Sequence, residues 1–69
     1  MDEIGRFEAC YAKYGAMLFR LALSQLGTKE AAEDVVQEVF LKRMSRRDFR
    51  DIEHEKRWLI RVTVNECHS

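Results

Sequence analysis

None of the 69 residues is proline, and the absence of this helix breaker favours uninterrupted helices. A chain this short forms one domain at most and buries only about 60% of its unfolded surface, which leaves little room for an enclosed enzyme pocket. Hydrophobic residues make up 46% of the chain and charged residues 35%, a globular rather than a disordered composition. The sequence therefore predicts a single all-α domain over residues 1–69, a compact unit of three to four helices.

Apolar residues recur every three or four positions from Ile4 onward, which is the spacing of one side of a helix. This stripe consists of Ile4, Phe7, Tyr11, Tyr14, Leu18 and Leu21, and a second line consists of Phe19, Leu23 and Leu26. Gly15 is expected to mark a kink or a break between two shorter helices. Gly27 predicts a helix stop, and Thr28 is the expected N-cap of the next helix.

The second predicted helix runs to about Met44, and its apolar side consists of Ala32, Val35, Val36, Val39 and Phe40. Residues 45–53 lose this period and are typical of a loop, which Phe49 and Ile52 are expected to attach to the core. From about His54 to His68 the pattern is helical again, around Trp58, Leu59, Val62 and Thr63.

Several classes of protein do not fit this sequence. No apolar run approaches the roughly 18 residues of a membrane span, and the acidic N-terminus is unlike a secretory signal, so we expect a cytoplasmic chain with no membrane partner. Cys10 and Cys67 are too few for a disulfide framework. Cys67, His68 and His54 suggest a metal site only weakly, because adjacent helical side chains diverge by about 100°. We expect no metal and no cofactor.

The charges are unevenly distributed although they sum to zero. Residues 1–41 hold four basic and seven acidic side chains, whereas residues 42–61 hold eight and four. On the second helix, four residues lie within about 100° of one another on the side opposite Ala32 and Val36: Asp34, Gln37, Glu38 and Leu41. An aliphatic side chain beside carboxylates and an amide suits a docking patch for a basic partner. The alternative is a solvated face.

Basic residues gather after the second helix: Lys42, Arg43, Arg46, Arg47, Arg50, Lys56, Arg57 and Arg61. Such a cluster can neutralise phosphates, and the interleaved aromatic residues Phe49 and Trp58 can stack on an unpaired base. The alternative is a solubilising loop that nearby carboxylates partly cancel. On the last helix His54, Arg57, Arg61, Asn65 and His68 form the only polar strip, with Trp58 at its margin. Trp58 also suits a core anchor, and Asn65 suits either base reading or a helix end.

Two segments resemble one known family. Residues 32–41, Ala-Glu-Asp-Val-Val-Gln-Glu-Val-Phe-Leu, resemble the polymerase-binding helix of extracytoplasmic-function sigma factors. Residues 56–65, Lys-Arg-Trp-Leu-Ile-Arg-Val-Thr-Val-Asn, resemble the promoter-recognition helix of the same family, and the spacing of Phe7, Tyr11 and Tyr14 resembles its first helices. The resemblance runs from about Phe7 to Asn65.

The resemblance implies a transcription initiation factor domain and two binding faces. Asp34, Gln37, Glu38 and Leu41 would bind the clamp helices of the RNA polymerase β′ subunit. The non-template strand of the minus-ten promoter element would bind a second set: Arg46, Arg47, Arg50, Lys56, Arg57, Trp58, Arg61 and Asn65. This set would capture one base flipped out of the duplex. The resemblance also admits an anti-sigma factor as a partner.

Members of that family continue into a second helical domain that reads the minus-thirty-five element, which we expect to be absent from a chain that stops at Ser69. Promoter binding by the chain alone is then expected to be weak, because two half-sites normally act through joined domains.

Three alternative functions are weighed against this one. A helical protein-interaction module with a sigma-like fold would leave DNA unbound, and exposed hydrophobic surface or a dimer that masks Arg61 and Asn65 would favour it. A helix-turn-helix reader of duplex DNA is suggested by the tight turn at residues 27–28, but phosphates would repel Asp34 and Glu38. An enzyme is disfavoured because no nucleophile, base and orienting group are spaced to meet, so no catalytic residue is assigned.

Overall fold

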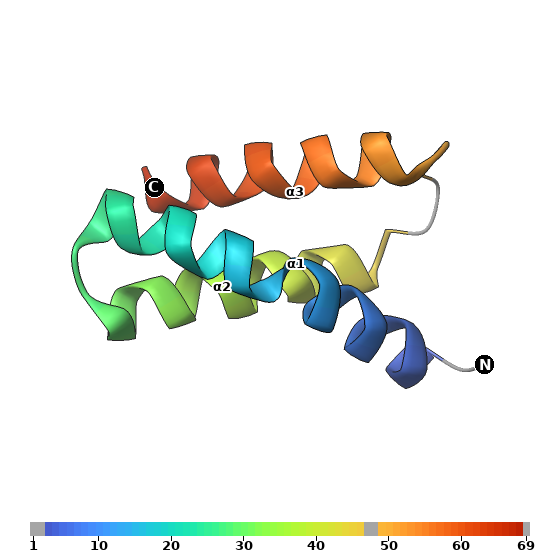
Figure 1. Cartoon of the computed structure of the whole chain (residues 1–69), viewed down its shortest axis with the longest axis horizontal. Coiled ribbons are helices and arrows are strands. Elements are labelled where there is room, and N and C mark those ends of the chain that lie inside the picture. The colour runs from blue at the N-terminus through green and yellow to red at the C-terminus, as the bar shows by residue number, and fades with distance from the viewer. Residues whose placement is uncertain (1–2, 47–48, 69) are drawn as a thin grey trace.

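Three helices form the part of the chain that the computed structural model describes, which is residues 3–46 and 49–68, with side chains from residue 8 onward. Helix α1 spans Glu3–Leu26, α2 spans Lys29–Met44 and α3 spans Ile52–Cys67. α1 and α3 run in the same direction and α2 runs against both (Figure 1). Each helix packs against the other two. The predicted all-α fold is therefore confirmed, and within the described ranges it has three helices.

α1 is one uninterrupted helix, so a break at Gly15 is wrong. Gly15 is buried, and a Cβ atom added there would lie 3.2 Å from the ring of Tyr11. The glycine is therefore explained by the Tyr11 ring, which packs along the helix, and not by an end of the helix. Tyr11 itself was predicted to belong to the apolar stripe, yet it is 46% exposed and its ring lies 4.9 Å from that of Phe40. Ile4 and Phe7 lie in α1 but outside the described side chains.

The turn between α1 and α2 follows the predicted chemistry. Gly27 has a φ of 85°, a left-handed conformation that glycine adopts without steric cost, and it ends α1. Thr28 is the N-cap of α2, and its hydroxyl oxygen accepts a hydrogen bond from the backbone N–H of Ala31 at 3.3 Å. Glu30 lies in the first turn, where the helix dipole favours an anion. These contacts fix where α2 begins.

α3 begins at Ile52, two residues before the predicted start at His54. The reason is an N-cap at Asp51, whose Oδ1 accepts a hydrogen bond from the backbone N–H of His54 at 2.8 Å. Ile52 is 61% exposed, so the prediction that it attaches the loop to the core is wrong. Phe49 is half-buried and packs against Trp58, so it makes that attachment alone of the two.

The core lies where the three helices meet. Its buried hydrophobic members are Cys10, Tyr14 and Leu18 from α1, Val36, Val39 and Phe40 from α2, and Leu59 from α3. Thr63 is also fully buried, and its hydroxyl donates a hydrogen bond to the carbonyl oxygen of Leu59 at 2.7 Å, which satisfies the polar group. Within the described ranges, no helix is both long enough and apolar enough to cross a membrane.

Candidate functional site

The four residues on the outer side of α2 form a surface that we call the acidic face: Asp34, Gln37, Glu38 and Leu41. All four are exposed, and Leu41 is 58% exposed although it is aliphatic. Ala32 and Val36 on the opposite side of the helix are buried. The three polar side chains form no hydrogen bond or ion pair with another described residue. The acidic face is therefore open to a partner, in the geometry that the sequence predicts.

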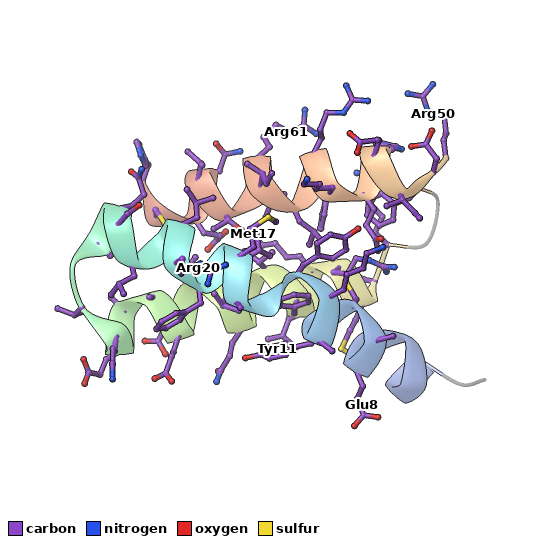
Figure 2. The ribbon with its side chains drawn as sticks, in the orientation of Figure 1. Glu8, Tyr11, Met17, Arg20, Arg50 and Arg61 are labelled. Carbon is purple, nitrogen blue, oxygen red and sulfur yellow. The ribbon has the colours of Figure 1, made fainter. Side chains whose placement is uncertain are left out.

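The outer side of α3 carries cations. Arg57, Arg61 and Asn65 are exposed, whereas Leu59 and Thr63 on the inner side are buried. Figure 2 shows Arg61 projecting outward from α3 and Arg50 projecting near the start of this helix, both away from α1. Because each helix packs against the other two, the outer sides of α2 and α3 point in different directions. The carboxylates of the acidic face and the arginines on the outer side of α3 thus occupy separate sides of the domain.

A surface hollow of about 370 Å³ lies within this basic region, and we call it the cationic hollow. It is lined by Arg50, His54, Arg57, Trp58 and Arg61. The Nδ1 atom of His54 accepts a hydrogen bond from the backbone N–H of Arg50 at 3.1 Å, which ties the first turn of α3 to the residue before its N-cap. Trp58 is half-buried and also packs against the core. Trp58 is therefore both a core residue and a wall of the hollow.

An aromatic and cationic stack that the sequence did not predict lies beside the hollow. The ring of Phe49 lies 5.4 Å from the ring of Trp58 and 5.4 Å from that of His54, edge to face in both pairs. The guanidinium of Arg46 lies 4.8 Å from the Phe49 ring and 5.5 Å from the Trp58 ring. Arg46 is thus held against the aromatic surface instead of extending into solvent. In the sequence, the interleaving of aromatic and basic residues is the one indication of this stack.

The structure brings most, but not all, of the predicted DNA-binding residues together. Arg50, Arg57, Trp58 and Arg61 share the cationic hollow, and Arg46 reaches the ring of Trp58. Asn65 lies one helical turn beyond Arg61 on the same strip and is exposed. Lys56 is half-buried and does not line the hollow, because it lies about 160° from Trp58 around α3. Arg47 lies outside the described residues.

Two of the clustered cations are already paired with carboxylates. Arg43 Nη2 lies 2.7 Å from Glu55 Oε2, and the two side chains are only 20% and 16% exposed. Lys42 forms an ion pair with Glu66, and this hydrogen bond raises the pKa of the lysine. Both of these members of the basic cluster therefore have a carboxylate partner within the domain. The sequence holds no signal for these pairs, since their partners lie 12 and 24 positions away.

Cys10 lies under the ion pair formed by Arg43 and Glu55. Its Sγ atom lies 3.8 Å from Glu55 Oε2, and burial, together with the charge of this carboxylate, raises the pKa of the thiol to about 11. The thiol is therefore protonated near neutral pH and packs as a small core residue. Among the described residues, no group of three or more His, Cys, Asp and Glu side chains could hold a metal ion.

Comparison with known proteins gives one family. The family model for sigma-70 region 2 matches residues 10–69, which cover all three helices apart from the first turns of α1. No curated protein and no solved structure matches the chain. The match includes both the acidic face and the basic region around the cationic hollow. The chain therefore belongs to the sigma-70 region 2 family, and it is a transcription initiation domain that binds core RNA polymerase and recognises and melts the minus-ten promoter element, not an enzyme.

Proposed function

We propose that the chain is the region 2 domain of an extracytoplasmic-function sigma factor, with one binding face for polymerase and one for promoter DNA. Membership of this subfamily is supported by the resemblance of residues 32–41 and 56–65 to its polymerase-binding and promoter-recognition helices. The first segment lies within α2 and the second within α3. Such a protein works where core polymerase and chromosome are, so the proposal places it in the cytoplasm.

The acidic face is proposed to bind the clamp helices of the β′ subunit. Asp34 and Glu38 are exposed on the rigid backbone of α2 and have no internal hydrogen bond or ion pair among the described residues, so their carboxylates are free to accept arginine side chains. Leu41 supplies an exposed apolar contact at the edge of these charges. An anti-sigma factor that covered this face would exclude polymerase, and the proposal admits one as a partner.

The basic side, which comprises Arg46, Arg50, Arg57, Trp58, Arg61 and Asn65, is proposed to bind the non-template strand of the minus-ten element. Arg57 and Arg61 would neutralise phosphates along the strand. A flipped base would enter the cationic hollow and stack against Trp58, since stacking on an aromatic ring is worth about 1–3 kcal/mol per base. Lys56 belongs to the same proposal as a phosphate contact, and so does Arg47, which lies outside the described residues.

The observation that carries this proposal is the separation of the two faces. The carboxylates of the acidic face project from α2, and the arginines of the hollow come from α3 and the residues just before it. A domain with this arrangement can contact a protein and a nucleic acid at the same time, without either partner covering the other. Each face should therefore be removable without loss of the other.

A reciprocal binding experiment tests this expectation. The chain is titrated with a β′ clamp fragment and, separately, with a single-stranded minus-ten oligonucleotide. The Asp34→Arg, Glu38→Arg double variant should lose about 100-fold in affinity for the clamp fragment, since like charges then face each other, and should keep its DNA affinity. The Arg57→Glu, Arg61→Glu double variant should show the opposite pattern.

A matched control is the Glu8→Arg, Glu53→Arg double variant, which makes the same change of net charge at exposed sites outside the acidic face. It should bind the clamp fragment as the unaltered chain does. Equal clamp affinity for the Asp34→Arg, Glu38→Arg variant and this control would remove the acidic face from the proposal. Loss of both partners in either reversed variant would mean that the faces are not separate.

A further inference from the structure

Arg43 and Glu55 lie beneath the basic side and belong to neither proposed face. Arg43 comes from the last turn of α2, and Glu55 comes from the first turn of α3. Two guanidinium nitrogens, Nε and Nη2, each lie 2.7 Å from Glu55 Oε2. The two side chains are 20% and 16% exposed, so most of this ion pair is shielded from water. The pair is therefore a directed link between the two helices that flank the promoter-binding residues.

The remaining nitrogen of the guanidinium reaches the connection between these helices. Arg43 Nη1 donates a hydrogen bond to the carbonyl oxygen of Arg46 at 2.8 Å, and the guanidinium carbon Cζ lies 4.8 Å from the centre of the Phe49 ring. Phe49 in turn contacts Trp58, a wall of the cationic hollow. A single side chain thus contacts the backbone at Arg46 and the ring of Phe49 while Glu55 holds it in place.

The cost of such a pair points to a geometric role. Desolvation of a mostly buried ion pair offsets much of its Coulomb attraction, so an apolar pair of similar size would hold two helices together as well or better. An apolar pair, however, could not donate a hydrogen bond to the carbonyl of Arg46. Unlike a hydrophobic residue, the arginine can therefore orient the backbone between α2 and α3 through this hydrogen bond.

We propose that Arg43, oriented by Glu55, is a positioning residue for minus-ten recognition. It fixes the backbone at Arg46 and the ring of Phe49 so that Arg46 and Trp58 meet the incoming base in one arrangement. This inference rests on the proposed function of the basic side, because it concerns how that side is held. It adds two residues, from outside the surface, that determine how strongly one base is preferred over another.

A lysine at position 43 separates this role from simple helix pairing. Lysine keeps a positive charge for Glu55, but it has neither the planar fork that reaches the Arg46 carbonyl at the same time nor the flat surface that packs on Phe49. The Arg43→Lys variant should therefore keep the ion pair that links α2 to α3 and lose the contacts with the Arg46 carbonyl and the Phe49 ring. The same substitution at the exposed Arg20 of α1 is the matched control (Figure 2).

Three measurements are made on each variant. The melting temperature reports the packing of the helices. The emission of Trp58, which is the only tryptophan of the chain, reports the stack of Arg46 and Phe49 in the absence of DNA. Affinities for four single-stranded minus-ten oligonucleotides that differ at one base, measured with the chain bound to core polymerase, report base preference.

We expect Arg43→Lys to melt near the temperature of the unaltered chain, to shift the Trp58 emission, and to narrow the affinity ratio between the best and worst base by about fivefold, the size of one neutral hydrogen bond. Arg20→Lys should change none of the three. If Arg43→Lys also melts early, Glu55→Gln takes its place, since the amide oxygen still accepts from Arg43 but holds it less firmly. Glu55→Gln should show the same shift and the same narrowing.

The outcomes separate this inference from the proposed function. Unchanged emission together with an unchanged affinity ratio in Arg43→Lys, while the unaltered chain discriminates among bases, would overturn the positioning role alone. An unaltered chain that binds all four oligonucleotides equally would overturn base recognition by the basic side, and with it the role of Arg43 in base preference. A shifted Trp58 emission in Arg43→Lys would then still show that Arg43 holds Arg46 and Phe49 in place.

Discussion

The acidic face and the basic side of this domain are built in different ways. The acidic face comes from one helix, and its polar side chains have no internal hydrogen bond or ion pair among the described residues. The basic side joins the residues after α2 to α3, and it depends on neighbours beneath it: Arg46 lies against two aromatic rings, and Arg43 below is paired with Glu55. Helix geometry alone sets the first surface, whereas tertiary contacts set the second.

Binding and stability are therefore coupled on the basic side and separate on the acidic face. Side chains of the acidic face can be replaced without disturbing a contact that holds the fold, so their substitution should change affinity only. Side chains that support the basic side also join α2 to α3, so their substitution should change both stability and DNA recognition.

The largest effect is expected when the ion pair beneath the basic side is broken. The Arg43→Met variant leaves the Glu55 carboxylate without its cation at a site where only 16% of the side chain is exposed. We expect the free energy of unfolding to fall by about 2 kcal/mol, less than for a fully buried pair because water still reaches part of the site. Urea unfolding followed by circular dichroism measures this change.

The comparison variant is Asp34→Ala, Glu38→Ala, which removes two charges from the acidic face. Its free energy of unfolding should stay within about 0.5 kcal/mol of the unaltered chain, as is usual for exposed positions. If it lost as much stability as Arg43→Met, the contrast between the two surfaces would be broken.

The second effect concerns pH. Burial and the Glu55 charge raise the pKa of the Cys10 thiol from 9.0 to about 11, so the folded chain holds this proton more tightly than the unfolded chain does. The resulting contribution to stability is complete below about pH 9 and is lost as the pH rises through about 11. We expect a loss of about 2 kcal/mol across this window.

Lysine and tyrosine residues titrate in the same range, so the measurement is a difference. Unfolding free energies from pH 8 to pH 11 are compared between the unaltered chain and Cys10→Ala, whose side chain carries no proton. The gap between the two should shrink by about 2 kcal/mol over the window. A constant difference in unfolding free energy would show that folding does not raise the pKa of the Cys10 thiol. Cys10 of α1 would then not be coupled electrostatically to the Arg43–Glu55 ion pair.

The smallest effect is a change of base preference. Asn65 is exposed on the strip that carries Arg61, and its amide can donate to and accept from a base edge. Asn65→Ala should weaken binding of the preferred minus-ten oligonucleotide by about fivefold and leave disfavoured bases almost unchanged. Gln37→Ala, which removes an exposed amide from the acidic face, should alter no DNA affinity. An equal loss for every base in Asn65→Ala would assign Asn65 to the backbone or to the helix end.

Local sequence rules predicted the helical elements well, for identifiable physical reasons. Gly27 and Thr28 supply a left-handed turn and a side-chain cap, which act within four residues and need no tertiary partner. The same rules placed the start of α3 two residues late, because the acidic residue at position 51 was counted with the loop although it is the N-cap. Gly15 was misread because the cause of that glycine is the ring of Tyr11, not a local backbone requirement.

The acidic face and the cationic strip of α3 follow from the order of the residues alone, because a helix places residues at fixed angles whatever it packs against. Which cations face outward and which are paired depends instead on how the helices pack. The register between α2 and α3 brings Arg43 to Glu55, and the course of the connection lays Arg46 on Phe49 and Trp58. Contacts between residues twelve positions apart depend on how the chain returns on itself, and helical periodicity carries no information about that path.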